Sequence, residues 1–230
     1  MRTIACVVFD LDDTLYLERD YVRSGFAAVG REVRWRLGIP GFASVAWREF
    51  CRGRRGDVFD RALEHFGVPA ERKLVRDLVE IYRNHDPAIA LEPDALSCLE
   101  ALRGRVALAV VTDGPLVSQR AKVRALDIDR YVDEVVYTAM LGAGFEKPHP
   151  RAFELVQQHL GCRGRACLYA ADNPAKDFGA PRALGWRTYR CRRPLGLHAA
   201  VASDGPIDVE ASNLSKLAQL VAMPSEEAAP

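Results

Sequence analysis

This 230-residue sequence has few of the features typical of secreted, membrane-spanning or nucleic-acid-binding proteins. Its 32 Lys and Arg residues almost balance its 31 Asp and Glu residues, so the net charge of +1 gives no basic excess for binding nucleic acid or an anionic membrane surface. No apolar stretch approaches the roughly 20 residues of a membrane-spanning helix. The first predicted strand begins at residue 3, so we expect no signal peptide.

Cysteine-based frameworks are also missing. The six cysteines form no C-x-x-C pair, and Cys6 falls inside an apolar strand. We therefore predict free thiols in a reducing cytosol, and thus a cytoplasmic protein, with neither a disulfide framework nor a zinc site. The apolar share of 49% is ample for one large α/β domain or for a core with a smaller module. The cysteines are Cys6, Cys51, Cys98, Cys162, Cys167 and Cys191.

The most informative segment is residues 4–15, IACVVFDLDDTL. Its six apolar residues stop at an acid, which is typical of a strand buried on both faces at the centre of a parallel sheet. Side chains two apart on a strand share a side, so we expect Asp10 and Asp12 to emerge together, roughly 7 Å apart at their Cα atoms. Carboxylates crowded in this way need a cation or a shared proton. The plainer alternative is a polar turn in which Asp13 or Thr14 caps the next helix.

Residues 18–88 show helical periodicity and no strand pattern. Apolar residues recur at three or four positions, beginning with Val22, Phe26 and Val29. Such a block is too long for a simple crossover between parallel strands, so we predict an inserted helical domain. The predicted helices are 20–37, 43–51, 57–66 and 69–85.

Strands and helices alternate from residue 89 onward, which predicts a doubly wound parallel α/β sheet. The predicted strands are 106–111, 134–137, 166–171 and 187–190. The predicted helices are 94–102, one ending at 126, 150–160, one ending at 184, and 213–222. The predicted organisation is a core of 1–17 and 89–223, a helical domain of 18–88 and a flexible tail of 224–230.

Further polar residues follow the predicted strands. Thr112 stands before Gly114, where a helix begins, and a hydroxyl beside helix N–H groups can bind phosphate, although Thr112 alone is an ordinary turn residue. Lys147 could bring a positive charge to the same phosphate. Asp172 and Asp177 bracket a turn and by themselves could cap a helix. Combined with the acids of the first strand, these groups predict a magnesium and phosphate site, because Mg²⁺ prefers oxygen ligands.

Four stretches, VVFDLDDTLY, VVTDG, EKPHP and DNPAKD, resemble in order the four motifs of the haloacid dehalogenase-like (HAD) superfamily, and the resemblance covers about residues 3–190. It implies a Rossmann-like core with a helical cap inserted after the first motif. It also implies a magnesium-dependent phosphatase that hydrolyses a small phosphorylated metabolite, such as a sugar phosphate, through an aspartyl-phosphate intermediate.

The resemblance also implies a role for individual residues. Asp10 matches the nucleophile and a metal ligand, and Asp172 matches the acidic metal ligand. Asp12 matches the general acid and base, with its backbone carbonyl on the magnesium, and we expect burial beside Asp10 to raise its pKa. The matched phosphate-binding positions are Thr112, Asp113, Gly114 and Lys147. The matched supporting positions are Asn173 and Asp177.

Several alternatives stay open. Asp12 favours phosphate chemistry over dehalogenation, but a sugar phosphomutase keeps the same residues. A phospho-ligand-binding protein without turnover and a receiver-like signalling domain are the other classes, although receivers are about half this length and lack the helical insert. Arginines at 52–55 and 190–193 could bind a second anionic group of the substrate or form solvated turns. The protein is expected to be a monomer or a homodimer.

Overall fold

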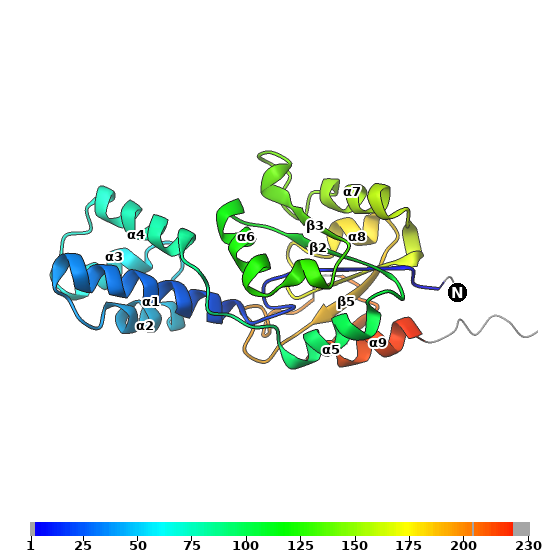
Figure 1. Ribbon diagram of the computed structural model, residues 1–230, viewed down its shortest axis with the longest axis horizontal. Helices are drawn as coiled ribbons and strands as arrows, with labels where there is room; N and C mark the ends of the chain where they lie inside the picture. Colours follow the sequence, from blue (N-terminus) through cyan, green and yellow to red (C-terminus); the bar gives the residue numbers. More distant parts are fainter. Residues whose placement is uncertain (1–2, 204, 223–230) are drawn as a thin grey trace, which may run out of the picture. The chain divides into compact units, whose positions relative to one another are not determined.

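A parallel sheet forms the centre of the computed structural model, which describes residues 3–203 and 205–222. Within these residues the sheet has six strands in the order β3-β2-β1-β4-β5-β6 (Figure 1). This confirms the predicted α/β architecture, although the short edge strand β6 was not predicted. The strands are β1 (Cys6–Phe9), β2 (Ala107–Thr112), β3 (Glu134–Tyr137), β4 (Cys167–Ala171), β5 (Arg187–Cys191) and β6 (Val209–Ala211).

The first strand is uniformly apolar because it is buried on every side. Cys6 of β1 pairs with Ala107 of β2 on one edge and with Cys167 of β4 on the other. All four side chains of β1 are fully buried. Because side chains alternate between the two faces of a sheet, Cys6 and Val8 belong to the same apolar cluster as Phe153, while the residues between them face the opposite side.

Helices cover both faces of the sheet. Figure 1 shows α5 and α9 on one face and α7 and α8 on the other. The observed bounds differ from the predicted ones by only a few residues. The helices of this part are α5 (Pro93–Leu102), α6 (Leu116–Ala125), α7 (Arg151–Leu160), α8 (Gly179–Ala183) and α9 (Ser215–Ala222).

Residues Asp20–Ile89 form a second compact unit, distinct from the unit of Met1–Arg19 and Ala90–Pro230. Phe26 lies at its centre, with ring centroids 5.7 Å from Phe59 and 5.8 Å from Tyr82. These apolar contacts stabilise the helices against one another. The helices are α1 (Glu18–Leu37), α2 (Phe42–Cys51), α3 (Val58–His65) and α4 (Arg72–Asn84).

The chain leaves and rejoins the sheet unit at one hydrogen-bonded point. The backbone N–H of Glu92 donates to the carbonyl of Leu15 at 3.0 Å. The Arg193 guanidinium donates to the carbonyl of Thr14 at 2.7 Å and to both carboxylate oxygens of Asp94 at 2.8 and 3.0 Å. The two chain segments at the base of the insertion are thus clamped together by a buried arginine.

Three further predictions concern the chain as a whole. All six cysteines are free, and Cys51 is exposed. Among the described residues, no helix has the length and apolar character needed to cross a membrane. The predicted flexible tail, residues 224–230, lies outside the described residues.

Candidate active site

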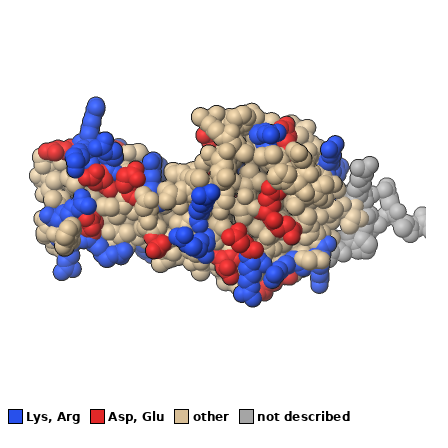
Figure 2. All heavy atoms as spheres, turned by 45° about the horizontal axis from the view of Figure 1, so that its top comes forward, with Lys and Arg blue, Asp and Glu red and all other residues tan. Residues whose placement is uncertain are grey.

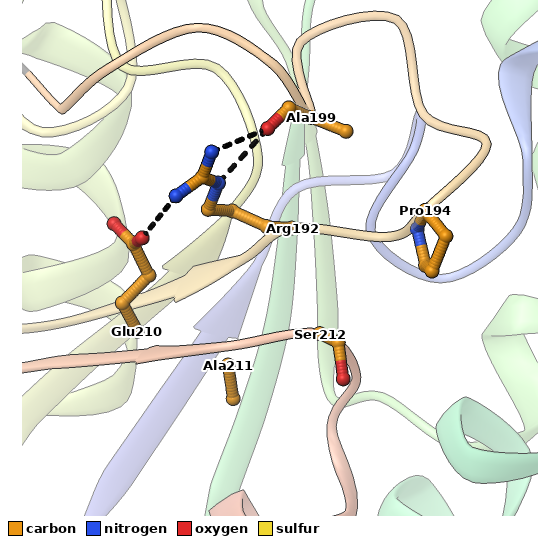
Figure 3. A pocket seen from close by; sticks show the side chains of 6 residues that line it. All are labelled: Arg192, Pro194, Ala199, Glu210, Ala211 and Ser212. Atoms are coloured by element: carbon orange, nitrogen blue, oxygen red, sulfur yellow. Dashed lines mark hydrogen bonds and ion pairs between the residues drawn. The ribbon is translucent and has the colours of Figure 1, made fainter.

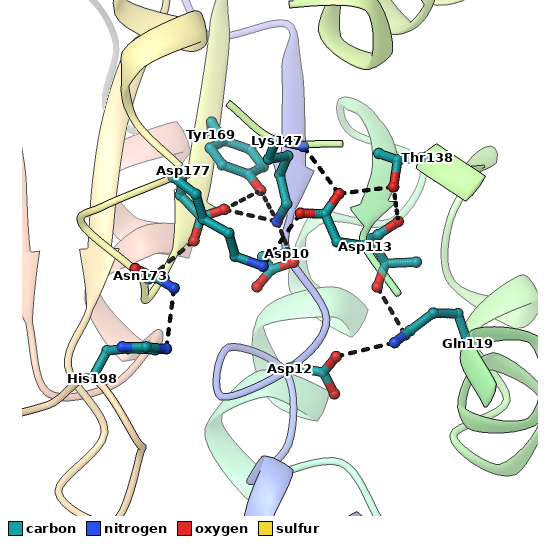
Figure 4. Close-up of polar contacts among 12 residues, drawn as sticks. Asp10, Asp12, Asp113, Gln119, Thr138, Lys147, Tyr169, Asn173, Asp177 and His198 are labelled. Carbon is teal, nitrogen blue, oxygen red and sulfur yellow. Dashed lines mark hydrogen bonds and ion pairs between the residues drawn. The ribbon is translucent and has the colours of Figure 1, made fainter. Parts of the chain in front are cut away.

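Three buried acids meet at the carboxyl ends of β1 and β4, the central pair of strands. Figure 4 shows two of them, Asp10 and Asp177. Asp10 directly follows β1, Asp172 directly follows β4, and Asp177 comes from the turn before α8. Each offers a carboxylate oxygen, and these oxygens lie within 4.8 Å of one another. This acidic triad can hold a metal ion, because three carboxylates so close together repel unless a cation offsets their charge.

The state of Asp172 fits a hard divalent cation. Its Oδ2 atom is buried and has no hydrogen-bond partner among the described residues. Burial raises the pKa of Asp172 to about 10, and the charges of Asp10 and Asp177 add to this shift. A buried carboxyl oxygen without a partner is unfavourable, and coordination of a cation such as Mg²⁺ would satisfy it.

Lys147 brings a positive charge of the protein itself to the acidic triad. Its fully buried ammonium group donates to Asp10 at 2.6 Å and to the Tyr169 hydroxyl at 3.0 Å, and it forms an ion pair with Asp177 at 2.7 Å. Burial would lower the pKa of Lys147, but Asp10 and Asp177 raise it well above its usual value, so Lys147 is charged. Burial raises the pKa of Asp10 to about 6 against the opposing charge of Lys147, which leaves Asp10 mostly ionised at neutral pH.

Asp12 lies in a separate network, turned toward Gln119 in Figure 4. Lys122 of α6 donates to both of its carboxylate oxygens at 2.7 and 2.9 Å, and the Tyr16 hydroxyl donates to Oδ1. Burial alone would raise the pKa of Asp12, but Lys122 and Tyr16 lower it below its ordinary value. The expected rise in the pKa of Asp12 is therefore wrong, because Lys122 and Tyr16 outweigh the effect of burial. No pattern in the sequence indicated a lysine at this carboxylate.

Thr112 and Gly114 shape the turn after β2. The Thr112 hydroxyl donates to Oε1 of Gln119 at 2.9 Å, and both side chains are buried. Gly114 has φ of 125°, and a Cβ atom there would lie 2.8 Å from Nε2 of Gln119. Glycine is therefore required at this position both by its backbone conformation and by the close approach of Gln119.

Asp113 connects this turn to the two lysines of the site. Its Oδ1 accepts from the Thr138 hydroxyl at 2.8 Å and from the backbone N–H of Lys147 at 3.2 Å. Its Oδ2 forms an ion pair with Lys176 at 3.3 Å. Asp113 therefore fixes the loop that carries Lys147 beside the strand ends.

Asn173 orders the turn after β4. Its backbone N–H donates to Oδ2 of Asp177 at 3.0 Å, and its side-chain amide lies 3.0 Å from Nε2 of His198 (Figure 4).

Asp13, close after the end of β1, stabilises local structure. Its carboxylate accepts from the backbone N–H of Glu18 at the start of α1 and from that of Leu197. The capping alternative was thus right for Asp13, while Asp10 belongs to the acidic triad.

The arginines at 190–193 are neither substrate-binding candidates nor a solvated turn. Arg190 is fully buried, and its donors go to backbone carbonyls and to Ser203. Arg193 clamps the base of the insertion. Neither of the two roles expected for the arginines of residues 190–193 was right for Arg190 and Arg193, because apolar periodicity does not reveal an arginine that donates to carbonyls inside the core. In the helical unit, Arg52 and Arg54 are exposed and paired with neighbouring acids, which favours the solvated turn.

Sequence reasoning missed several residues of this site. The signals were weak, because each of them is polar and enters the site only through contacts between distant elements. Lys176 was the easiest to find, since it lies within the stretch DNPAKD. The missed residues are Tyr16, Gln119, Lys122, Thr138, Tyr169, Lys176 and His198.

A hollow of about 380 Å³ lies elsewhere, beside β6 (Figure 3). Arg192 in its wall is already paired with Glu210 at 2.7 Å and donates to the carbonyl of Ala199. The charge of Arg192 is therefore balanced by Glu210 within the wall of the hollow. On the face drawn in Figure 2, basic and acidic side chains are interspersed.

Comparison with known proteins identifies the family. A model described as haloacid dehalogenase-like hydrolase matches residues 4–185, so the chain belongs to this family. A glyceraldehyde 3-phosphate phosphatase of Methanopyrus kandleri is 30% identical over 204 residues, which cover 83% of this chain and 84% of that protein. A phosphoserine phosphatase of Thermus thermophilus is 33% identical over 167 residues, which cover 71% of this chain and 64% of that protein.

The fold agrees with this assignment. The structure of a HAD-superfamily hydrolase from Geobacter sulfurreducens matches with a TM-score of 0.69 at 21% sequence identity, covering 95% of this chain and 96% of that one. The chain is thus a hydrolase with the HAD fold.

Proposed function

We propose that this protein is a magnesium-dependent phosphatase that hydrolyses a small phosphomonoester through an aspartyl-phosphate on Asp10. The observation that carries the proposal is the ionised Asp10 held by Lys147 inside an acidic triad with an unpartnered Asp172 oxygen. Oxygen ligands of this kind suit Mg²⁺, which would be held by Asp10, Asp172 and the backbone carbonyl of Asp12. When bound, the cation offsets the negative charge that carboxylate and phosphate bring together.

In the first step, a carboxylate oxygen of Asp10 attacks phosphorus, and the bond between phosphorus and the ester oxygen breaks. Lys147 keeps Asp10 ionised and fixed in orientation, which lowers the cost of aligning it for in-line attack. Asp12 donates a proton to the leaving alkoxide. Because Lys122 stabilises its ionised form, Asp12 carries no proton at rest and must take one up from water before the ester bond breaks.

In the second step, a water molecule attacks the aspartyl-phosphate and releases inorganic phosphate. Asp12 accepts the proton of this water, a task for which its lowered pKa leaves it in the required ionised state. Asp177 and Asn173 support the site by holding Lys147 and the turn after β4. Asp10 is regenerated as a carboxylate.

The substrate class is proposed from the relatives. Their names include phosphatases for glyceraldehyde 3-phosphate and for phosphoserine, which are both three-carbon phosphomonoesters. We propose that the helical unit Asp20–Ile89 acts as the cap that selects among such substrates. The free cysteines, including exposed Cys51, support a cytoplasmic location, and the oligomeric state is proposed as monomer or homodimer.

A phosphate-release screen tests this proposal. Three-carbon phosphates, sugar phosphates, nucleotides and an aryl phosphate are incubated with the protein, with Mg²⁺ or with excess chelator. Release that requires Mg²⁺ supports the phosphatase, whereas full release in chelator contradicts the metal assignment. Transfer of the phosphoryl group between two hydroxyls of one sugar, without release to water, would instead indicate a phosphomutase.

A further inference from the structure

Lys147, which the sequence predicts to bind phosphate, already has buried partners. An ammonium group has three N–H donors. That of Lys147 donates to Asp10 at 2.6 Å and to the Tyr169 hydroxyl at 3.0 Å, and it forms an ion pair with Asp177 at 2.7 Å. A phosphate oxygen that accepts from Lys147 therefore shares this ammonium group with the buried contacts that hold Asp10 and Asp177 in place.

Thr112, the second predicted phosphate donor, is in a similar state. A hydroxyl has one donor hydrogen, and that of Thr112 goes to Oε1 of Gln119 at 2.9 Å. Gln119 in turn donates to Asp12, so turning the Thr112 hydroxyl would leave a buried amide oxygen without a partner. Both predicted donors are thus committed to internal partners.

Lys176 differs from both. It lies in the turn between Asp172 and Asp177, and its side chain is 35% exposed. Within the described residues its ammonium makes one hydrogen bond, to Oδ2 of Asp113 at 3.3 Å, which leaves two N–H donors for a ligand. It also lies close enough to Asp10 for its charge to stabilise that carboxylate.

Asp113 does not depend on Lys176 for its hydrogen bonds. Its other oxygen accepts from the Thr138 hydroxyl at 2.8 Å and from the backbone N–H of Lys147 at 3.2 Å. Lys176 can therefore move from Asp113 to a ligand oxygen without leaving a buried carboxylate unpartnered.

We infer that Lys176 binds the phosphoryl oxygens of the substrate in addition to Lys147, exchanging its long contact with Asp113 for them, while Lys147 also positions Asp10. This inference rests on the proposed phosphatase function. It adds a second, partly exposed lysine at the phosphoryl group beside the buried lysine that contacts the nucleophile. A phosphate dianion attracts a partly exposed ammonium more strongly than Asp113 does, because it has twice the charge and several acceptor oxygens.

The test compares Lys176→Met, which keeps the length and removes the charge, with Lys176→Arg, which keeps the charge. Lys73→Met is the matched control, because Lys73 makes an ion pair of the same length, 3.3 Å, with Asp77 on the surface of the helical unit. Calorimetry measures the binding of inorganic phosphate in the presence of Mg²⁺. Steady-state kinetics with an alkyl and an aryl phosphate give kcat and KM.

Loss of a charged hydrogen bond should weaken phosphate binding and raise KM about tenfold or more in Lys176→Met, equally for both leaving groups. Lys176→Arg should recover most of this loss, and Lys73→Met should match the wild type. Unchanged phosphate affinity in Lys176→Met would overturn the inference. If the wild type hydrolyses no phosphate ester, the proposed function fails, and phosphate binding still decides the role of Lys176. If the wild type also fails to bind phosphate, the inference falls as well.

Discussion

Replacing Arg190 by methionine should destabilise the sheet unit by about 3–5 kcal/mol. The Arg190 side chain is fully buried in β5. It donates to the carbonyls of Asp172 at 3.2 Å, His198 at 3.1 Å and Val201 at 2.7 Å, and to the Ser203 hydroxyl at 2.6 Å. Methionine fills a similar volume but donates no hydrogen bond, so these acceptors lose their partner inside the core.

The magnitude follows from this count of contacts. A hydrogen bond from a charged donor contributes about 1.5–3 kcal/mol, and four of them are lost together. Part of the loss is returned, because the variant no longer buries a guanidinium whose nearest acid, Glu210, is 3.5 Å away. Four such bonds amount to about 6–12 kcal/mol, and the several kcal/mol that burying one ion costs reduce the net loss to the expected 3–5 kcal/mol.

Arg192→Met is the matched control. Arg192 contacts the same loop, through the carbonyl of Ala199, but its side chain is 37% exposed and its acid partner is at the surface. Its loss should cost no more than about 1 kcal/mol. Urea unfolding is followed by the fluorescence of Trp186, which is buried in the sheet unit, in a background with Trp35 and Trp47 replaced by phenylalanine. A stability of Arg190→Met within about 1 kcal/mol of the control would refute the reasoning.

The remaining predictions concern the acids of the site. Asp10→Asn should reduce phosphate release to less than about a tenth of the wild-type rate, because an amide is a poor nucleophile, as a phosphate-release assay will check. Asp12→Asn should slow phosphorylation of the enzyme by alkyl phosphates about a hundredfold and spare phosphorylation by aryl phosphates with acidic phenols. Rapid-quench kinetics will show the second case as a burst of phenol release. Equal slowing with both substrates would exclude Asp12 as the acid. With a pKa of about 10, Asp172 is protonated at pH 8 in the metal-free protein, so Mg²⁺ binding should release a proton and tighten as the pH rises toward 10. Calorimetry in two buffers of different ionisation enthalpy measures that proton, and its absence would contradict the assignment. Ca²⁺ should bind and inhibit, because its larger and looser coordination sphere misaligns in-line attack.

Much of the fold was predictable because its strands are buried on both faces. The continuous apolar run before Asp10 could only be a central strand, and the acids at the strand ends converge because parallel strands end at one edge. The edge strand β6 escaped prediction, since three half-exposed residues carry no apolar run.

The candidate site was predictable where residues follow a strand and less so where a helix supplies them. Asp10 and Asp172 belong to the first kind. Lys122 belongs to the second, because α6 turns the polar side chains of Ser118, Gln119 and Lys122 into the protein, and apolar periodicity cannot detect a buried polar face. The pKa of Asp12 was therefore predicted in the wrong direction.

The hydrogen bond between Leu15 and Glu92 makes the sheet unit independent of what is inserted there. The chain closes on itself at this point, and Arg193 ties Thr14 to Asp94 just beside it. The free energy of closing a loop grows slowly with its length, by only about 0.6 kcal/mol for each doubling. A helical unit of different size or sequence can therefore be grafted between the same two stems without shifting the pairing of β1 with β2. Recombination at this joint would exchange the helical unit, the part proposed to select the substrate, in one event while the acids at the strand ends stay where they are.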